Sequence, residues 1–141
     1  MVLVGLPGSG KSYWARKQGV AVLSSDELRF LLTDDQTNQA IHREVFAMLR
    51  HLLRRRLELA RPLTFIDATN ITPKERRSYI KTAQIYNCQA EAVFFNVPPE
   101  VCKARNANRD RIVPDHVIDA MYARLIPPTV EEGFDSVTTY A

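Results

Sequence analysis

Residues 5–12 have the sequence GLPGSGKS, in which glycines at the first and sixth positions are followed by lysine and serine. This spacing is that of a complete phosphate-binding loop, called the P-loop below. An apolar run at residues 1–4 precedes the loop and predicts a buried strand. Residues 13–19 predict a helix that ends at Gly19. Strand, glycine-rich loop and helix in this order are typical of a site for a nucleoside triphosphate, whereas a glycine-rich surface turn would lack both flanking elements.

Each residue type in the loop has a physical reason to be there. Gly8, Ser9 and Gly10 allow successive backbone N–H groups to turn inward around a phosphate, and the following helix N-terminus adds positive potential. Lys11 is expected to reach the β- and γ-phosphates, and the Ser12 hydroxyl is expected to hold Mg²⁺. The loop predicts triphosphate binding but not the reaction, since kinases, switches and motor ATPases share it.

Composition limits the class of protein. A chain of 141 residues, 45% hydrophobic and 25% charged, suits one soluble domain over 1–141, although it could equally be one module of a longer protein. No apolar run approaches the roughly 18 residues that cross a membrane. Because the short run at residues 1–4 leads directly into the loop, we expect no signal peptide. Two cysteines without metal-type spacing indicate free thiols and a cytoplasmic location. A net charge of +3 permits a polyanionic partner without requiring one.

Strand-like and helix-like segments alternate along the chain, which predicts an α/β fold of the P-loop kinase type. Right-handed crossovers then give a parallel five-stranded sheet in the order 2-3-1-4-5 with helices on both faces. The expected strands are 1–4, 20–26, 63–67, 91–97 and 136–140. The expected helices are 13–19, 27–32, 39–60, one opened by a Thr72–Glu75 capping box, one from 99, and 115–125.

Polar residues follow the second strand, at the edge where ligands bind in open parallel sheets. Asp26 is a candidate general base, because phosphoryl transfer to a hydroxyl needs a group that accepts its proton. Arg29 lies three residues further on, so on a helix it shares a face with Asp26 and can hold an anionic acceptor. The alternative is structural: Asp26 caps the short helix and Arg29 is solvated.

Asp67 ends the third strand, at the position of an acid that orients Mg²⁺ or its waters. Its structural alternative is an Asx-turn. Residues 105–114, which include Arg105 and Arg109, are predicted to form a lid. The two arginines are expected to close over the triphosphate. The alternative for these arginines is a salt-bridged surface helix. Arginines on the 39–60 helix could contact nucleic acid, but a charged helical face is usually only solvated.

With these motifs in view, the chain resembles the P-loop polynucleotide 5′-kinases, in particular the kinase module of bacterial RNA end-healing proteins and, more distantly, the phage polynucleotide kinase. The resemblance covers nearly the whole chain. It depends on the P-loop, on Ser24-Ser25-Asp26-x-x-Arg29, and on residues 67–70 (DATN), 95–98 (FNVP) and 105–109 (RNANR). Several of these motifs together are specific, although each alone is not.

The resemblance implies a set of roles. Lys11 and Ser12 bind phosphate and Mg²⁺, Asp26 is the base, and Arg29 clamps an acceptor phosphate. Arg105 and Arg109 belong to the lid and contact ATP. The resemblance also places Asp67 near the acceptor. The acceptor site expected from the sequence comprises Arg29, Asp67, Thr69, Asn70 and Arg76.

The leading hypothesis is therefore an ATP-dependent kinase that phosphorylates the 5′-hydroxyl end of RNA or DNA. A small-metabolite kinase acting on a sugar acid or nucleotide sugar would use the same P-loop, base and lid. A nucleotide-dependent switch is less favoured, because an acid stands where a kinase needs a base. The chain also lacks an Asn-Lys-x-Asp guanine signature, which favours adenine as the donor's base.

Overall fold

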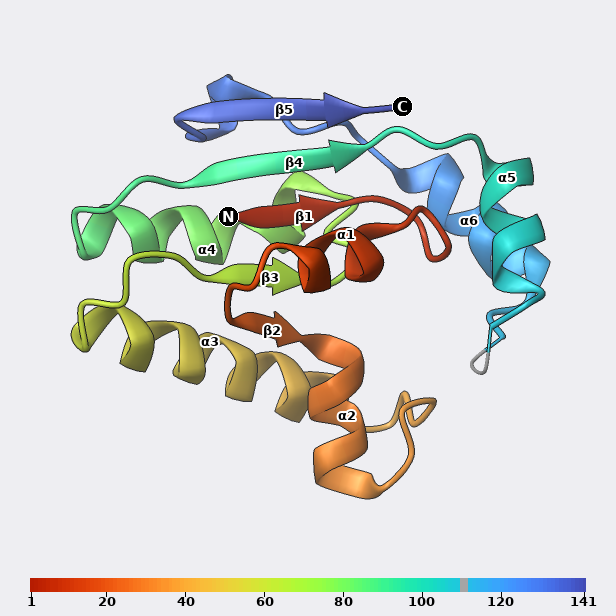
Figure 1. The fold of residues 1–141 in the computed structure, drawn as a ribbon, viewed down its shortest axis with the longest axis horizontal. Coiled ribbons are helices and arrows are strands. Elements are labelled where there is room, and N and C mark those ends of the chain that lie inside the picture. The colour runs from red at the N-terminus through yellow and green to blue at the C-terminus, as the bar shows by residue number, and fades with distance from the viewer. Residues whose placement is uncertain (110–111) are drawn as a thin grey trace.

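The structure of the protein is a computed structural model that describes residues 1–109 and 112–141. Its centre is a parallel five-stranded sheet in the order β2-β3-β1-β4-β5 (Figure 1). This arrangement confirms the α/β fold and the strand order predicted from the sequence. The strands are β1 (Val2–Val4), β2 (Val22–Ser24), β3 (Phe65–Asp67), β4 (Glu91–Phe95) and β5 (Ser136–Tyr140).

Helices cover both faces of the sheet, because successive side chains of each buried strand point to opposite sides. Val2 and Val4 belong to the core beneath α3 and α4, whereas Leu3 packs with Ala15 of α1 on the other face. The helices are α1 (Lys11–Lys17), α2 (Ser25–Thr33), α3 (His42–Glu58), α4 (Pro73–Ile85), α5 (Pro99–Asn106) and α6 (Asp115–Arg124), with a 3₁₀ turn, η1 (Val130–Glu132), before β5. Among the described residues, no helix is long and apolar enough to cross a membrane.

The helix boundaries follow from local hydrogen bonds. The predicted capping box of α4 is confirmed, with Thr72 and Glu75 each accepting from the other's backbone N–H. Helix α3 begins at His42 instead of residue 39, because two side chains in the preceding loop bind the backbone and compete with helix formation. The Asp35 Oδ1 accepts from Thr37 N at 2.9 Å, and the Asn38 Oδ1 accepts from Ala40 N at 2.9 Å.

All five strands point the same way, so their carboxyl ends lie at one edge of the sheet (Figure 1). The P-loop, α2 and the chain leading to α5 leave the sheet at this edge. A third apolar cluster, formed by Leu6, Cys102, Val113 and Ile118, packs α5 and α6 against the P-loop. This apolar cluster holds the two ends of the predicted lid, residues 105–114, against the P-loop.

Candidate active site

Lys11 lies folded across the P-loop. Its Nζ donates to the carbonyl oxygens of Gly5 and Leu6, both at 2.9 Å, and to the Ser9 Oγ at 3.4 Å. The side chain is buried, and burial lowers the pKa of Lys11 below its ordinary value, although the nearby Asp67 carboxylate opposes this. A phosphate that displaced these carbonyls would give the ammonium a negatively charged partner.

The glycines of the loop have conformations that other residues rarely adopt. Gly8 and Gly10 have φ of 83° and 97°, in the left-handed region. A Cβ on Gly8 would lie 2.4 Å from the Cys102 carbonyl oxygen, so the loop packs directly on the backbone of α5. A Cβ on Gly10 would lie 3.8 Å from Nη1 of Arg105, which puts this guanidinium beside the loop.

Ser12 and Asp67 meet at the start of α1 and the end of β3. The Ser12 hydroxyl donates to the Asp67 Oδ2 at 2.6 Å, although the two residues are 55 positions apart in the chain. Asp67 is 7% exposed. A hydroxyl and a carboxylate together are the hard oxygen ligands that Mg²⁺ prefers, with waters and substrate phosphates completing its shell. The pair therefore fits the predicted metal position.

Asp26 and Arg29 form an ion pair on the first turn of α2. The Arg29 Nη1 lies 3.2 Å from the Asp26 Oδ1. The Arg29 side chain is buried, while that of Asp26 is 35% exposed and accessible to a ligand. The helix cap is Ser24, whose side chain accepts from the Glu27 N–H, so the structural alternative of Asp26 as the N-cap is wrong. Helix α2 follows β2 and the P-loop follows β1, so both lie at the carboxyl-end edge of the sheet (Figure 1).

The arginines of the predicted lid lie on the same side of the sheet as Lys11. Arg105 is near Gly10, and the charge of Arg109 lowers the pKa of Lys11. Residues 110 and 111 of the predicted lid lie outside the described residues.

Asn106, which the sequence analysis did not single out, joins the two ends of this segment. Its Nδ2 donates to the Val113 carbonyl at 2.5 Å, and its Oδ1 accepts from the Val113 N–H at 3.1 Å. The side chain is almost fully buried. One amide thus pairs with both backbone groups of a residue seven positions away, as a neighbouring strand would.

Two of the predicted acceptor residues are structural. Asn70 is 2% exposed, and its Nδ2 donates to the Leu3 carbonyl at 2.8 Å, which ties β1 to the turn after β3. Arg76 is 0% exposed and pairs with Glu132 through Nε and Nη2, at 2.9 and 2.8 Å. Its Nη1 donates to the Asn70 carbonyl. The donors of both side chains are bound to partners within the fold, which contradicts the expectation that they contact an acceptor. Thr69 is half-buried, and its carbonyl accepts from the Gly5 N–H.

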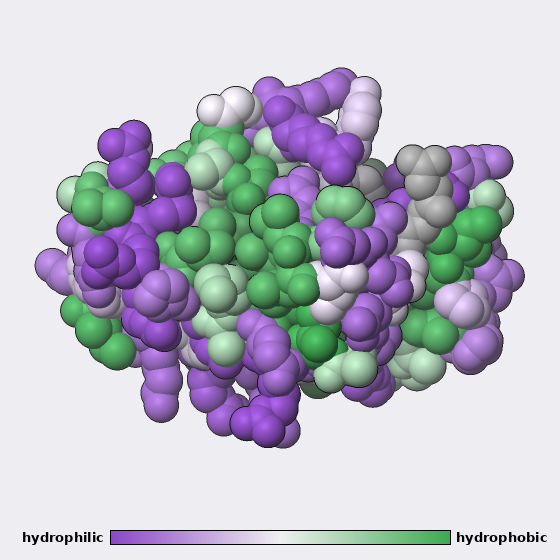
Figure 2. Space-filling view, turned by 90° about the horizontal axis from the view of Figure 1, so that it is seen from below, coloured by the Kyte–Doolittle hydropathy of each residue, from purple (hydrophilic) through white to green (hydrophobic). Residues whose placement is uncertain are grey.

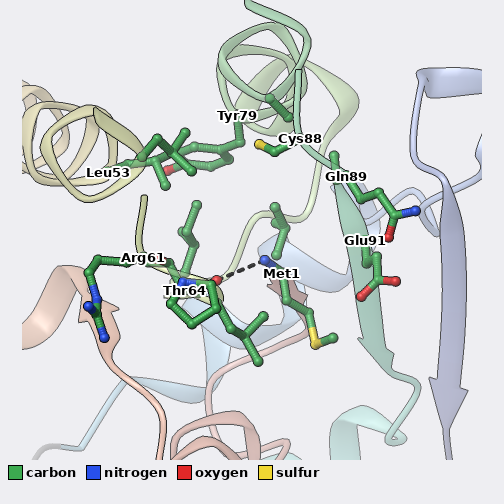
Figure 3. A pocket seen from close by; sticks show the side chains of 15 residues that line it. Met1, Leu53, Arg61, Thr64, Tyr79, Cys88, Gln89 and Glu91 are labelled. Carbon is green, nitrogen blue, oxygen red and sulfur yellow. Dashed lines mark hydrogen bonds between the residues drawn. The ribbon is translucent and has the colours of Figure 1, made fainter. Parts of the chain in front are cut away.

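A cavity of about 280 Å³ lies at the opposite end of the sheet, by the amino ends of the strands (Figure 3). Leu53, Tyr79 and Cys88 contribute to its wall, and the Met1 amino group donates to the Thr64 carbonyl beside it. Burial raises the pKa of Tyr79 to about 12, so its phenol is neutral. The cavity includes no P-loop residue and is separate from the phosphate site.

A second hollow, more open and about 360 Å³ in volume, adjoins Asp26. We call it the α2 groove; it is lined by Asp26, Glu27, Phe30, Leu31 and Gln36. Neither Phe30 nor Gln36 is among the binding-site residues predicted from the sequence. The available signal was spacing, because Phe30 is four residues after Asp26 and so lies on the same helical face.

Comparison with known proteins agrees with this architecture. A family model described as an AAA domain matches residues 1–128. The bifunctional polynucleotide phosphatase/kinase of Schizosaccharomyces pombe is 25% identical over 144 residues, covering 97% of this chain and 32% of that protein. The chain therefore spans about a third of the length of this curated relative.

Solved structures show the same fold at lower sequence identity. The Pnkp1/Rnl/Hen1 RNA repair complex contains a chain that matches with a TM-score of 0.75 and 23% identity, over 88% of this chain and 42% of that one. A gluconokinase from Sinorhizobium meliloti matches with a TM-score of 0.65 and 17% identity, over 98% and 79%. Both likenesses support a P-loop kinase-like fold.

Proposed function

The chain belongs to the AAA-domain family, and we propose that it is an ATP-dependent kinase that phosphorylates the 5′-hydroxyl end of RNA or DNA. The observation that carries the proposal is the pairing of a partly exposed carboxylate, Asp26, with a buried arginine, Arg29, beside a complete P-loop. A switch protein needs the loop alone, whereas a kinase also needs a base and a group that positions the acceptor.

On the donor side, the P-loop residues hold the phosphates of ATP. Backbone N–H groups of the loop surround the β-phosphate, and Lys11 turns from the Gly5 and Leu6 carbonyls to the phosphate oxygens. Arg105 and Arg109 neutralise the charge that develops on the transferred group. Their contacts strengthen as the reaction proceeds, so they contribute more to kcat than to ground-state binding.

On the acceptor side, Asp26 accepts the proton of the attacking hydroxyl. The hydroxyl oxygen forms a bond to the γ-phosphorus, the bond from that phosphorus to the bridging oxygen breaks, and ADP leaves with the electron pair. Arg29 keeps the Asp26 carboxylate oriented through their ion pair. The same guanidinium is suited to an acceptor phosphate, because arginine presents a planar fork of donors.

Ser12 and Asp67 would hold Mg²⁺, together with phosphate oxygens and waters. When bound, the ion supplies positive charge to the β- and γ-phosphate oxygens. The hydrogen bond between Ser12 and Asp67 already brings both oxygen ligands together. Asp67 thus serves the donor side in this proposal, with the acceptor next to it.

Two observations favour a polynucleotide acceptor over a metabolite. The chain carries the five motifs by which it resembles the polynucleotide 5′-kinases, and the relative from Schizosaccharomyces pombe is a polynucleotide phosphatase/kinase. The alternative is a small-metabolite kinase, such as one acting on a sugar acid. Its P-loop, base and lid would be the same, so the acceptor must be determined by experiment.

The test is a transfer assay with γ-labelled ATP and Mg²⁺. We expect label on RNA or DNA oligonucleotides with a 5′-hydroxyl end, and none on matched oligonucleotides that already carry a 5′-phosphate. A panel of sugar acids and nucleotide sugars is assayed in parallel. Label on a metabolite with none on any oligonucleotide would support the alternative, and ATP binding without transfer to any acceptor would contradict a kinase.

A further inference from the structure

The surface next to Asp26 is apolar as well as hollow. Figure 2 views the molecule from the side of α2 and α3 and shows hydrophobic surface gathered in the middle of this face, with hydrophilic side chains around it. The exposed apolar residues on these helices include Phe30, Leu31, Leu32 and Met48. Phe30 and Leu31 are 53% and 75% exposed, and both line the α2 groove.

We propose that the α2 groove binds the nucleobase of the acceptor's terminal nucleotide, with the ring of Phe30 as its stacking platform. This inference rests on the proposed function, because it takes Asp26 as the site of the attacking 5′-hydroxyl. It adds a binding subsite and a residue that distinguishes a nucleotide end from a simple sugar hydroxyl.

The distance along α2 suits one nucleoside. Asp26 and Phe30 are four residues apart on one helical face, which corresponds to about 6 Å along the axis. In a terminal nucleotide one sugar ring separates the 5′-hydroxyl from the base. A hydroxyl held at Asp26 therefore brings the attached base over the next turn of the helix, where the groove contains Phe30.

The chemistry of the lining favours a base over a phosphate. Asp26 and Glu27 contribute carboxylates, and the lining includes no lysine or arginine. The lining therefore offers no cation of its own to a phosphate, whereas a flat uncharged base can stack on an aromatic ring whatever its sequence. The Gln36 amide, across the groove, offers both a donor and an acceptor to a base edge.

The fold keeps these groups in place without using Phe30 in the core. Helix α2 buries Leu28 and Arg29, whereas Phe30 is 53% exposed. The loop that carries Gln36 is braced by Asp35, whose Oδ1 accepts from both the N–H and the hydroxyl of Thr37. Substitution of Phe30 should therefore leave the protein folded.

The experiment compares two single-stranded oligonucleotides with a 5′-hydroxyl end, identical except that one has an abasic terminal sugar. In the wild type we expect kcat/KM for the complete oligonucleotide to exceed that for the abasic one by about fivefold or more, as stacking on one aromatic ring allows. Phe30→Ala should lose this preference and react with both substrates at the wild-type abasic rate. Phe30→Tyr should keep it.

Leu32→Ala is the matched control, because Leu32 is an exposed apolar residue of the same helix outside the groove lining. It should behave as the wild type. A Phe30→Ala variant that keeps the preference, or that slows equally on both substrates, would overturn the subsite while leaving the kinase assignment intact. A wild type that labels metabolites and no oligonucleotide would overturn both.

Discussion

Replacement of Arg76 by leucine tests whether this residue supports the fold, as the structure indicates, or contacts the acceptor, as the sequence predicts. Its guanidinium is fully buried and makes two hydrogen bonds to Glu132 and one to the Asn70 carbonyl. These bonds join α4, the turn after β3 and the chain before β5. Arg76→Leu leaves the Glu132 carboxylate, whose side chain is 14% exposed, without this partner.

Breaking a buried ion pair by removing one partner costs about 3–5 kcal/mol of unfolding free energy. For a domain of this size each kcal/mol lowers Tm by roughly 2–4 °C, so the melting temperature should fall by roughly 6–20 °C. The double variant Arg76→Leu/Glu132→Leu removes both charges and should recover much of this loss.

The assay is thermal and urea unfolding of the wild type, both single variants and the double variant, combined with acceptor kinetics well below each Tm. We expect the KM for the acceptor to be unchanged in the folded Arg76→Leu protein. A variant with wild-type Tm and a raised acceptor KM would refute this reasoning and restore Arg76 to the acceptor site.

The remaining predictions concern the donor side. Lys11→Ala should lower kcat/KM by on the order of 10²-fold or more while the protein stays folded. Lys17→Ala, which changes an exposed lysine of the same helix, should have no effect on kcat/KM. Burial lowers the pKa of Lys11, and ATP is expected to bind the protonated lysine. The affinity for ATP should therefore begin to fall at a pH below the ordinary pKa of a lysine. Calorimetry across a pH series checks this, and Lys11→Arg should remove the dependence. Arg109→Ala, and to a lesser degree Arg105→Ala, should lower kcat more than they weaken ATP binding, whereas a rise in KM alone would contradict a lid.

Features that depend on local signals could be predicted from the sequence. The P-loop is a contiguous motif, and the Thr72–Glu75 capping box is set by residues three apart. The strand order follows from alternating elements and handed crossovers, which do not require side-chain detail. The predicted start of α3 is wrong by three residues, because side-chain bonds of Asp35 and Asn38 in the preceding loop compete with the helix. Hydrophobic periodicity carries no signal for such bonds.

The roles of Asn70, Arg76 and Asn106 could not be predicted, since each depends on a partner that the sequence does not identify. The Asn70 amide bonds to Leu3, 67 residues away, and Arg76 pairs with Glu132, 56 residues away. A polar residue at a strand end looks the same in sequence whether it faces a ligand or closes a buried turn. The partners that a side chain finds in the folded chain separate the two roles, as the bonds of Asn70 to Leu3 and of Arg76 to Glu132 show.

We propose Asp26 as the base of a kinase that acts on a 5′-hydroxyl end. Asp26→Asn keeps the shape of the side chain but cannot accept the proton, so ATP binding should stay near wild type while transfer is lost. The measurement is the ATP dissociation constant beside the rate of label transfer from γ-labelled ATP to a 5′-hydroxyl oligonucleotide, for wild type and variant. We predict an unchanged dissociation constant with a transfer rate at least about 10²-fold lower. Equal losses of binding and transfer, or wild-type transfer by the variant, would contradict the account.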